Sequence, residues 1–172
     1  LELPRENTSY MHENAFYYQS ARAAFRSLLQ AGKPQRVWLP KYICDAMLSP
    51  LLDEGIEHVW YDLDENLKVS DSIVLGEGDW ILYVNYFGVC QNQIDDLLNR
   101  FPANEIIFDY SQAFFDLPKL EALATIYSPR KFFGVPDGGI LVTDIDVTLP
   151  SIPDDDSLLR MPHLLKRLYE QP

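Results

Sequence analysis

An acid and an amine, each placed just after a short apolar run, are the residues of this sequence best suited to chemistry. Asp109 follows the run 105–108, with Gln112 three residues further on, and Lys131 precedes two phenylalanines in the segment SPRKFFG. Loss of hydration favours the uncharged form of a lysine, and an uncharged amine can attack a carbonyl carbon to form a Schiff base. The pair therefore indicates carbonyl chemistry, with Asp109 as a carboxylate that binds a cationic group.

Each of these residues also has an ordinary structural explanation. An Asp that follows a strand is often a helix cap or a solvated turn residue. A lysine usually extends its amine into water. Ser20, at the start of a predicted helix, is a good N-cap whatever else it does. Only the combination of these residues favours a site.

A place for an anion is predicted where the segment 19–24 opens a helix with small side chains. Such a helix start presents unpaired N–H groups and a partial positive charge, which together suit a phosphate. Further along the chain, Gly138 and Gly139 allow close backbone approach by a neighbouring segment or a ligand. Ser128, which follows the apolar run 124–127, adds a hydroxyl at another strand end.

Apolar strands alternate with helices along the chain, and these elements must position the candidate residues. The ligands of α/β proteins collect at the carboxyl ends of parallel strands, so residues directly after each strand are the first candidates. The order predicts an α/β fold, a three-layer sandwich with a mostly parallel sheet and helices on both faces. The predicted helices cover residues 20–30, 43–53, 93–100 and 157–169, the strands 37–39, 58–61, 80–84, 105–108, 124–127 and 139–143, and a linker 150–156.

Composition excludes several classes of function. The 172 residues suffice for one domain with its own core, and no apolar run is long enough to cross a membrane. A formal net charge of −12 opposes nucleic-acid binding. The two cysteines, Cys44 and Cys90, lack CxxC spacing and the three histidines lie far apart, so neither a disulfide framework nor a metal site is expected. A cytoplasmic location is the default expectation.

Taken in order, the helix start at Ser20 and the segments PKYICDAM, VNYFG, IIFDYSQAF and SPRKFFGVPDGGILVT resemble the DegT/DnrJ/EryC1/StrS sugar aminotransferases. These are fold-type I enzymes that depend on pyridoxal 5'-phosphate (PLP). The resemblance covers residues 15–145 and implies their PLP-binding large domain over residues 1–148, with a linker and the start of a C-terminal segment at 149–172. Family members are longer and the sequence does not begin with Met, so we expect a truncated chain that lacks the small C-terminal domain.

The resemblance also implies catalytic roles. Lys131 would form a Schiff base with PLP and move a proton between the substrate carbon and the cofactor carbon. Asp109 would pair with the protonated pyridine nitrogen, and Gln112 would approach the ring or its phenolic oxygen. The implied reaction transfers an amino group from an amino acid to a keto-sugar, expected to be nucleotide-linked, in a homodimer.

The phosphate of PLP would be bound, by the same resemblance, at the helix start that follows Ser20. Ala21 and Arg22 match the Gly-Thr pair that receives the phosphate in the family, and Ser128 matches a hydroxyl near it. The sequence departs from the family at this pair. It also has Asn85 where a His is frequent, and the usual ring-stacking aromatic position falls near residues 43–44.

Two other interpretations stay open. The chain could be a catalytically silent α/β interaction or regulatory domain that retains the aminotransferase scaffold, which its short length favours. It could also be a flavodoxin-like binding domain in which Asp109 and Lys131 are unrelated residues.

Overall fold

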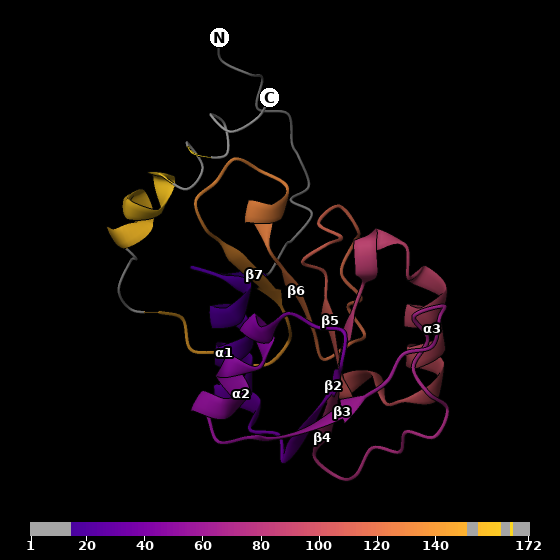
Figure 1. Cartoon of the computed structure of the whole chain (residues 1–172). Helices are drawn as coiled ribbons and strands as arrows, with labels where there is room; N and C mark the ends of the chain where they lie inside the picture. Colours follow the sequence, from indigo (N-terminus) through magenta and orange to yellow (C-terminus); the bar gives the residue numbers. More distant parts are fainter. Residues whose placement is uncertain (1–14, 151–154, 163–165, 167–172) are drawn as a thin grey trace.

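A seven-stranded sheet carries the fold in the computed structural model, which describes residues 15–150, 155–162 and 166. Helices cover both faces of this sheet, with α1 and α2 on one side and α3 on the other (Figure 1). The structure gives complete bounds for the α-helices α1 (Ala21–Gly32), α2 (Ser49–Asp53) and α3 (Gln91–Arg100), and residues 161, 162 and 166 are also α-helical. The strands are β1 (Ala15–Tyr18), β2 (Arg36–Pro40), β3 (Glu57–Tyr61), β4 (Asp79–Val84), β5 (Ile106–Asp109), β6 (Ala124–Tyr127) and β7 (Gly139–Val142).

The strand order is β1-β7-β6-β5-β4-β2-β3. β7 pairs antiparallel with both β1 and β6, and the other neighbouring strands pair in parallel. Every residue of β4, β5, β6 and β7 is buried, as expected for strands covered on both faces. The predicted fold class, a layered α/β protein with a mostly parallel sheet, is confirmed.

The parallel register brings the ends of β4, β5 and β6 to one edge of the sheet. Asp109, the last residue of β5, lies opposite Val84 of β4 and Ile126 of β6. A 3-10 turn, η4 (Pro129–Lys131), follows β6 after Ser128. The acid and the amine therefore come from neighbouring strand ends.

The start of α1 is fixed by the turn that precedes β7. The N–H of Gly138 donates to the carbonyl of Gln19 at 2.7 Å. A Cβ built on Gly139 would lie only 2.1 Å from the carbonyl carbon of Ser20, so this position has no room for a side chain. The close backbone approach predicted for the glycine pair is confirmed, and the neighbour is the first turn of α1.

Several predicted elements differ from the structure. The helix predicted for residues 43–53 is instead a 3-10 turn, η1 (Asp45–Met47), followed by the short α2. Cys44 is extended, and Pro50 lacks the N–H that an interior helical position needs, so α2 can only begin beside it. The edge strand β1 was not predicted, and β5 begins at Ile106 and includes Asp109.

The C-terminal part of the prediction is tested only where the structure describes it. Residues 155–160 form a 3-10 helix, η5 (Asp155–Arg160), whereas residues 161, 162 and 166 are α-helical, so the predicted α-helix 157–169 is confirmed only at these later positions. Part of that helix and part of the predicted linker lie outside the described residues, and the domain boundary at 148/149 stays a prediction. No helix among the described residues is long and apolar enough to cross a bilayer.

Gly139→Ala is expected to lower the free energy of unfolding by about 2–3 kcal/mol, because the new methyl group would meet the α1 backbone and not a movable side chain. Gly134→Ala is the matched control, since a Cβ there meets nothing within 4 Å, and its effect should stay within about 0.5 kcal/mol. Chemical denaturation followed by circular dichroism measures both. Equal stability of the two variants would contradict the packing described here.

Candidate functional site

Two adjoining cavities lie at the carboxyl ends of the parallel strands, and Asp109 and Lys131 line both. The first has a volume of about 220 Å³ and the second about 270 Å³. The first is lined by Gln19, Ser20, Ala21, Arg22, Cys44, Ala46, Met47, Asp109, Ser111, Ser128, Arg130, Lys131, Pro136, Asp137 and Arg160. The second is lined by Tyr42, Ile43, Cys44, Val84, Tyr86, Asp109, Ser111, Gln112 and Lys131.

Asp109 is a buried carboxylate, with 5% of its surface exposed. Its Oδ1 accepts a hydrogen bond from the N–H of Ser111 at 2.8 Å. Burial raises the pKa of Asp109 above its ordinary value, while the hydrogen bonds from Ser111 and the charge of Lys131 oppose this shift. A cation in the cavity would favour the ionised form, so the site is suited to pairing Asp109 with a positively charged ligand atom.

Lys131 is exposed, which differs from the expectation that the neighbouring phenylalanines would shield it from water. The ring of Phe133 packs against Phe114 with centroids 5.0 Å apart, and Phe132 packs against Phe115 at 5.5 Å. These rings contact one another across two loops, and Lys131 lies on the cavity side of the turn. Its amine is therefore accessible to a ligand in either cavity.

Hydrogen-bond donors for an anion meet in the first cavity. The Oγ of Ser20 caps α1 by accepting from the N–H of Ala23 at 3.2 Å. The N–H of Arg22 precedes the first hydrogen-bonded turn of α1 and has no acceptor among the described residues, whereas the parallel bridge between Ser20 and Gly138 directs the N–H of Ala21 to the carbonyl of Gly138. Ser128 lines the same cavity, is 5% exposed, and its hydroxyl makes no hydrogen bond within the described part of the chain.

Gln112 contributes to the second cavity only, although its Oε1 accepts from the N–H of Phe87 at 3.0 Å. The wall beside it is aromatic, because the rings of Tyr42 and Tyr86 stack 5.2 Å apart and nearly parallel. All seven residues predicted from the sequence line one or both cavities: Ser20, Ala21, Arg22, Asp109, Gln112, Ser128 and Lys131. Their individual roles stay predictions.

Asn85, which stands where the family often has His, does not line either cavity. Its Nδ2 donates to Asp116 at 2.9 Å and its Oδ1 accepts from the N–H of Cys90 at 3.2 Å. Asn85 therefore joins the end of β4 to the loops around it, and this explains a buried amide at that position.

The cavity residues that the sequence analysis missed as site candidates include Ser111, Arg130, Asp137 and Arg160. Ser111 follows Asp109 by two residues, so the strand-end rule could have found it. Asp137 and Arg160 lie on either side of the predicted linker, and no sequence spacing links them. Cys44 was noted only as an approximate position for the ring-stacking residue, and its exposed side chain lines both cavities.

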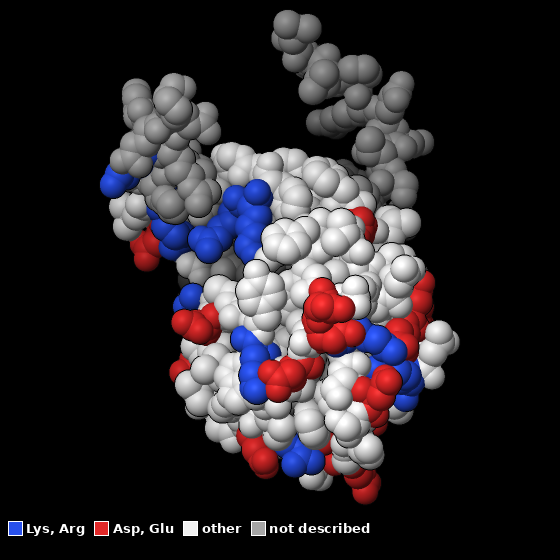
Figure 2. Space-filling model, turned by 45° about the vertical axis from the view of Figure 1, so that its right-hand side comes forward, with Lys and Arg blue, Asp and Glu red and all other residues white. Residues whose placement is uncertain are grey.

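Positive charge is concentrated at the first cavity of this acidic protein. Four of its lining residues are cations, namely Arg22, Arg130, Lys131 and Arg160. Figure 2 shows Lys and Arg side chains gathered at the upper left of one face, whereas acidic side chains are spread over its lower half. No group of three or more potential metal ligands occurs among residues 15–150, 155–162 and 166.

Comparison with known proteins identifies the fold. No family model and no curated protein matches the sequence. A sugar aminotransferase from Micromonospora echinospora is similar in structure, with 19% identity, a TM-score of 0.59, and coverage of 87% of this chain and 44% of that one. PseC from Helicobacter pylori, an aminotransferase involved in pseudoaminic acid biosynthesis, is 16% identical with a TM-score of 0.59, and the match covers 90% of this chain and 54% of PseC. NtdA from Bacillus subtilis, solved with the bound cofactor PMP, is 19% identical with a TM-score of 0.59, and the match covers 77% of this chain and 33% of NtdA.

The chain thus spans about half, or less, of the length of these structures. At such identities the similarity establishes the fold. The resemblance drawn from the sequence motifs is confirmed at that level: the chain has the α/β fold of these structures, over part of their length.

Proposed function

We propose that this chain is the cofactor-binding part of a PLP-dependent aminotransferase that transfers an amino group from an amino acid to a nucleotide-linked keto-sugar. The observation that carries the proposal is that Asp109 and Lys131 line one cavity together with the start of α1. An acid, an amine and an anion site are the three groups that PLP requires. The similarity to sugar aminotransferases supports the class of acceptor.

The residues present fit the cofactor. Ser128 lines the first cavity with a hydroxyl that has no partner in the described residues, and the N–H of Arg22 is likewise available, so a phosphate would have donors from two segments. Arg22 replaces the hydroxyl residue of the family pair with a guanidinium, which binds phosphate strongly. Asp109, buried beside the amine of Lys131, suits a protonated ring nitrogen.

The chain's own groups then divide the work of amino transfer. PLP, when bound, supplies a ring that stabilises negative charge on the substrate carbon. Asp109 would pair with the protonated ring nitrogen. Lys131 would hold the cofactor through its aldehyde and would take up and return the proton at the reacting carbon. Gln112, which lines the second cavity, would donate a hydrogen bond to the cofactor.

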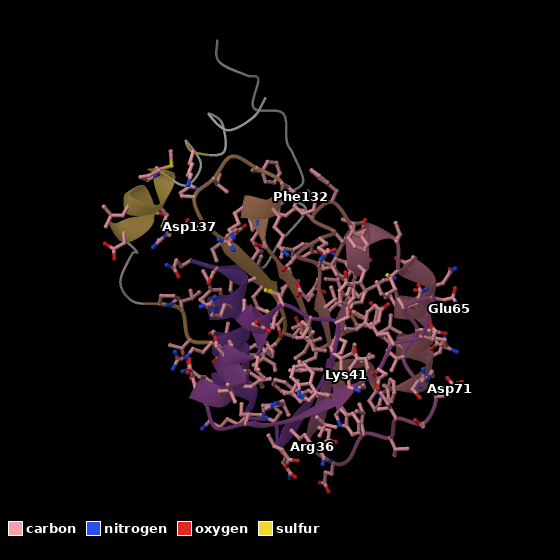
Figure 3. The ribbon with its side chains drawn as sticks, viewed as in Figure 1. Arg36, Lys41, Glu65, Asp71, Phe132 and Asp137 are labelled. Carbon is pink, nitrogen blue, oxygen red and sulfur yellow. The ribbon has the colours of Figure 1, made fainter. Side chains whose placement is uncertain are left out.

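We further propose that the protein acts in the cytoplasm as a homodimer. Phe115, Phe132 and Phe133 are 64%, 38% and 44% exposed and lie beside the cavity turn (Figure 3 labels Phe132). Contiguous exposed aromatic side chains are typical of interaction surfaces, and a second subunit covering them would also shield Lys131 from water. Free cysteines are compatible with a reducing compartment.

Replacement of Lys131 by Ala is expected to abolish covalent capture of PLP. Added PLP should give the wild-type protein a visible absorption band, and borohydride should fix the cofactor to Lys131, as peptide mass spectrometry detects. Lys41→Ala is the control, because this exposed lysine pairs with Asp62 and lines neither cavity. A folded wild-type protein that stays colourless with PLP would instead favour the silent-domain interpretation.

Asp109→Asn should leave PLP bound but slow the amino-acid-driven conversion of the cofactor to its amine form, on the order of 10²–10³-fold. The amide cannot hold a proton on the ring nitrogen by charge.

In the wild type, PLP uptake should also weaken as the pH falls through the raised pKa of Asp109, because the protonated carboxyl loses its attraction for the cation. Stopped-flow absorbance at several pH values measures both. An unchanged rate in the variant would remove Asp109 from the proposed role.

The dimer proposal predicts that the double variant Phe115→Asp/Phe133→Asp is monomeric, because charges would have to be buried at the contact. Val74→Asp, at a residue that is 78% exposed in a loop, is the control. Sedimentation velocity over a range of concentrations distinguishes the species. A wild-type monomer at every concentration would contradict the proposal.

A further inference from the structure

The 3-10 helix η5, which begins at the end of the predicted linker, lies at the first cavity and adds Arg160 to its lining. Asp137, in the turn before β7, binds this arginine: Nε and Nη2 of Arg160 donate to Oδ2 of Asp137 at 3.0 and 2.7 Å. Ser157 donates to the same oxygen. Figure 3 shows Asp137 beside η5. With side chains only 32% and 21% exposed, the pair has a defined orientation at the cavity.

The cavity also contains donors that lack acceptors in the described structure. Ser128 is 5% exposed and lines the cavity, and its hydroxyl forms no hydrogen bond with the described residues. Arg22, in the first turn of α1, lines the same cavity, and its N–H has no acceptor among the described residues. A polar group that faces a cavity without a protein partner is completed by a ligand or water. Donors from the start of α1, from the end of β6 and from η5 thus surround one cavity, and a tetrahedral oxyanion can accept from all three.

We infer that Arg160, oriented by Asp137, binds the same phosphate group as Ser128 and the start of α1, so that the ligand joins η5 to the sheet. The identification of PLP as the carrier of that phosphate rests on the proposed function, whereas the phosphate site does not. Because Arg160 lies after the linker, phosphate binding and the docking of η5 must strengthen each other, by the reciprocity of linked equilibria.

Titration calorimetry with inorganic phosphate tests the site directly. Arg160→Gln is expected to weaken phosphate binding roughly tenfold, the loss of one charge-assisted hydrogen-bonding group. Arg26→Gln is the matched control, because this arginine lies on the outer face of α1, pairs with Glu54 and changes the net charge equally; its effect should stay within about twofold. Equal affinities in the wild type and Arg160→Gln, or no phosphate binding by the wild type, would overturn the inference.

Asp137→Asn tests whether Asp137 acts by orienting Arg160 or only by its negative charge, because the two roles predict opposite changes in phosphate affinity. Removal of a negative charge near an anion site should strengthen phosphate binding if Asp137 acts only through its charge. If Asp137 acts by holding Arg160, the same change should weaken binding several-fold. Stronger binding in Asp137→Asn would therefore contradict the positioning role.

Hydrogen exchange of the segment 155–162 gives a readout that does not depend on catalysis. Phosphate and PLP should both slow its exchange in the wild type, pyridoxal without the phosphate should not, and Arg160→Gln should remove the effect. Protection by phosphate without capture of PLP by Lys131 would support this inference while refuting the proposed function. Capture of PLP by Lys131 with no protection of residues 155–162 would support the proposed function and refute this inference.

Discussion

The backbone contact between the start of α1 and the turn before β7 fixes the geometry on which the site depends. Gly138 donates to the carbonyl of Gln19, and Gly139 leaves the space that the backbone of Ser20 occupies. A side chain at Gly139 would push the helix start away from the strand ends. Because this contact holds, donors from segments far apart in the sequence, the α1 N-terminus and Ser128, line one cavity.

The cavity retains polar groups whose burial costs stability. Asp109 is nearly inaccessible at the end of β5, and burial raises its pKa, so its ionised form is held at a cost. Ser128 is a buried residue, and its hydroxyl has no partner among the described residues. An apolar edge would be more stable, so these groups are best explained by a ligand that completes them. Such a ligand stabilises the folded chain by mass action.

Sequence reasoning located the residues that lie at strand ends and missed those that depend on tertiary contacts. Asp109 and Lys131 were predictable, because parallel strands bring their carboxyl ends to one edge and both residues follow apolar runs. The helix predicted at 43–53 was wrong because extended Cys44 and Pro50 break its apolar periodicity into two short turns. The exposure of Lys131 was unpredictable, since Phe132 and Phe133 pack on rings from another loop.

Local charge, and not net charge, decides which anions this protein can bind. A formal charge of −12 repels a long polyanion, whose phosphates would extend over the acidic surface. A single phosphate inside the cavity would be near Arg22, Arg130 and Arg160, which line it. Salt screens charges beyond about 8–10 Å, so distant carboxylates would contribute little. The ion pair with Asp137 partly compensates the positive charge of Arg160 but fixes the orientation of the Arg160 side chain. The same distribution that disfavours nucleic acid therefore favours a small phosphorylated ligand.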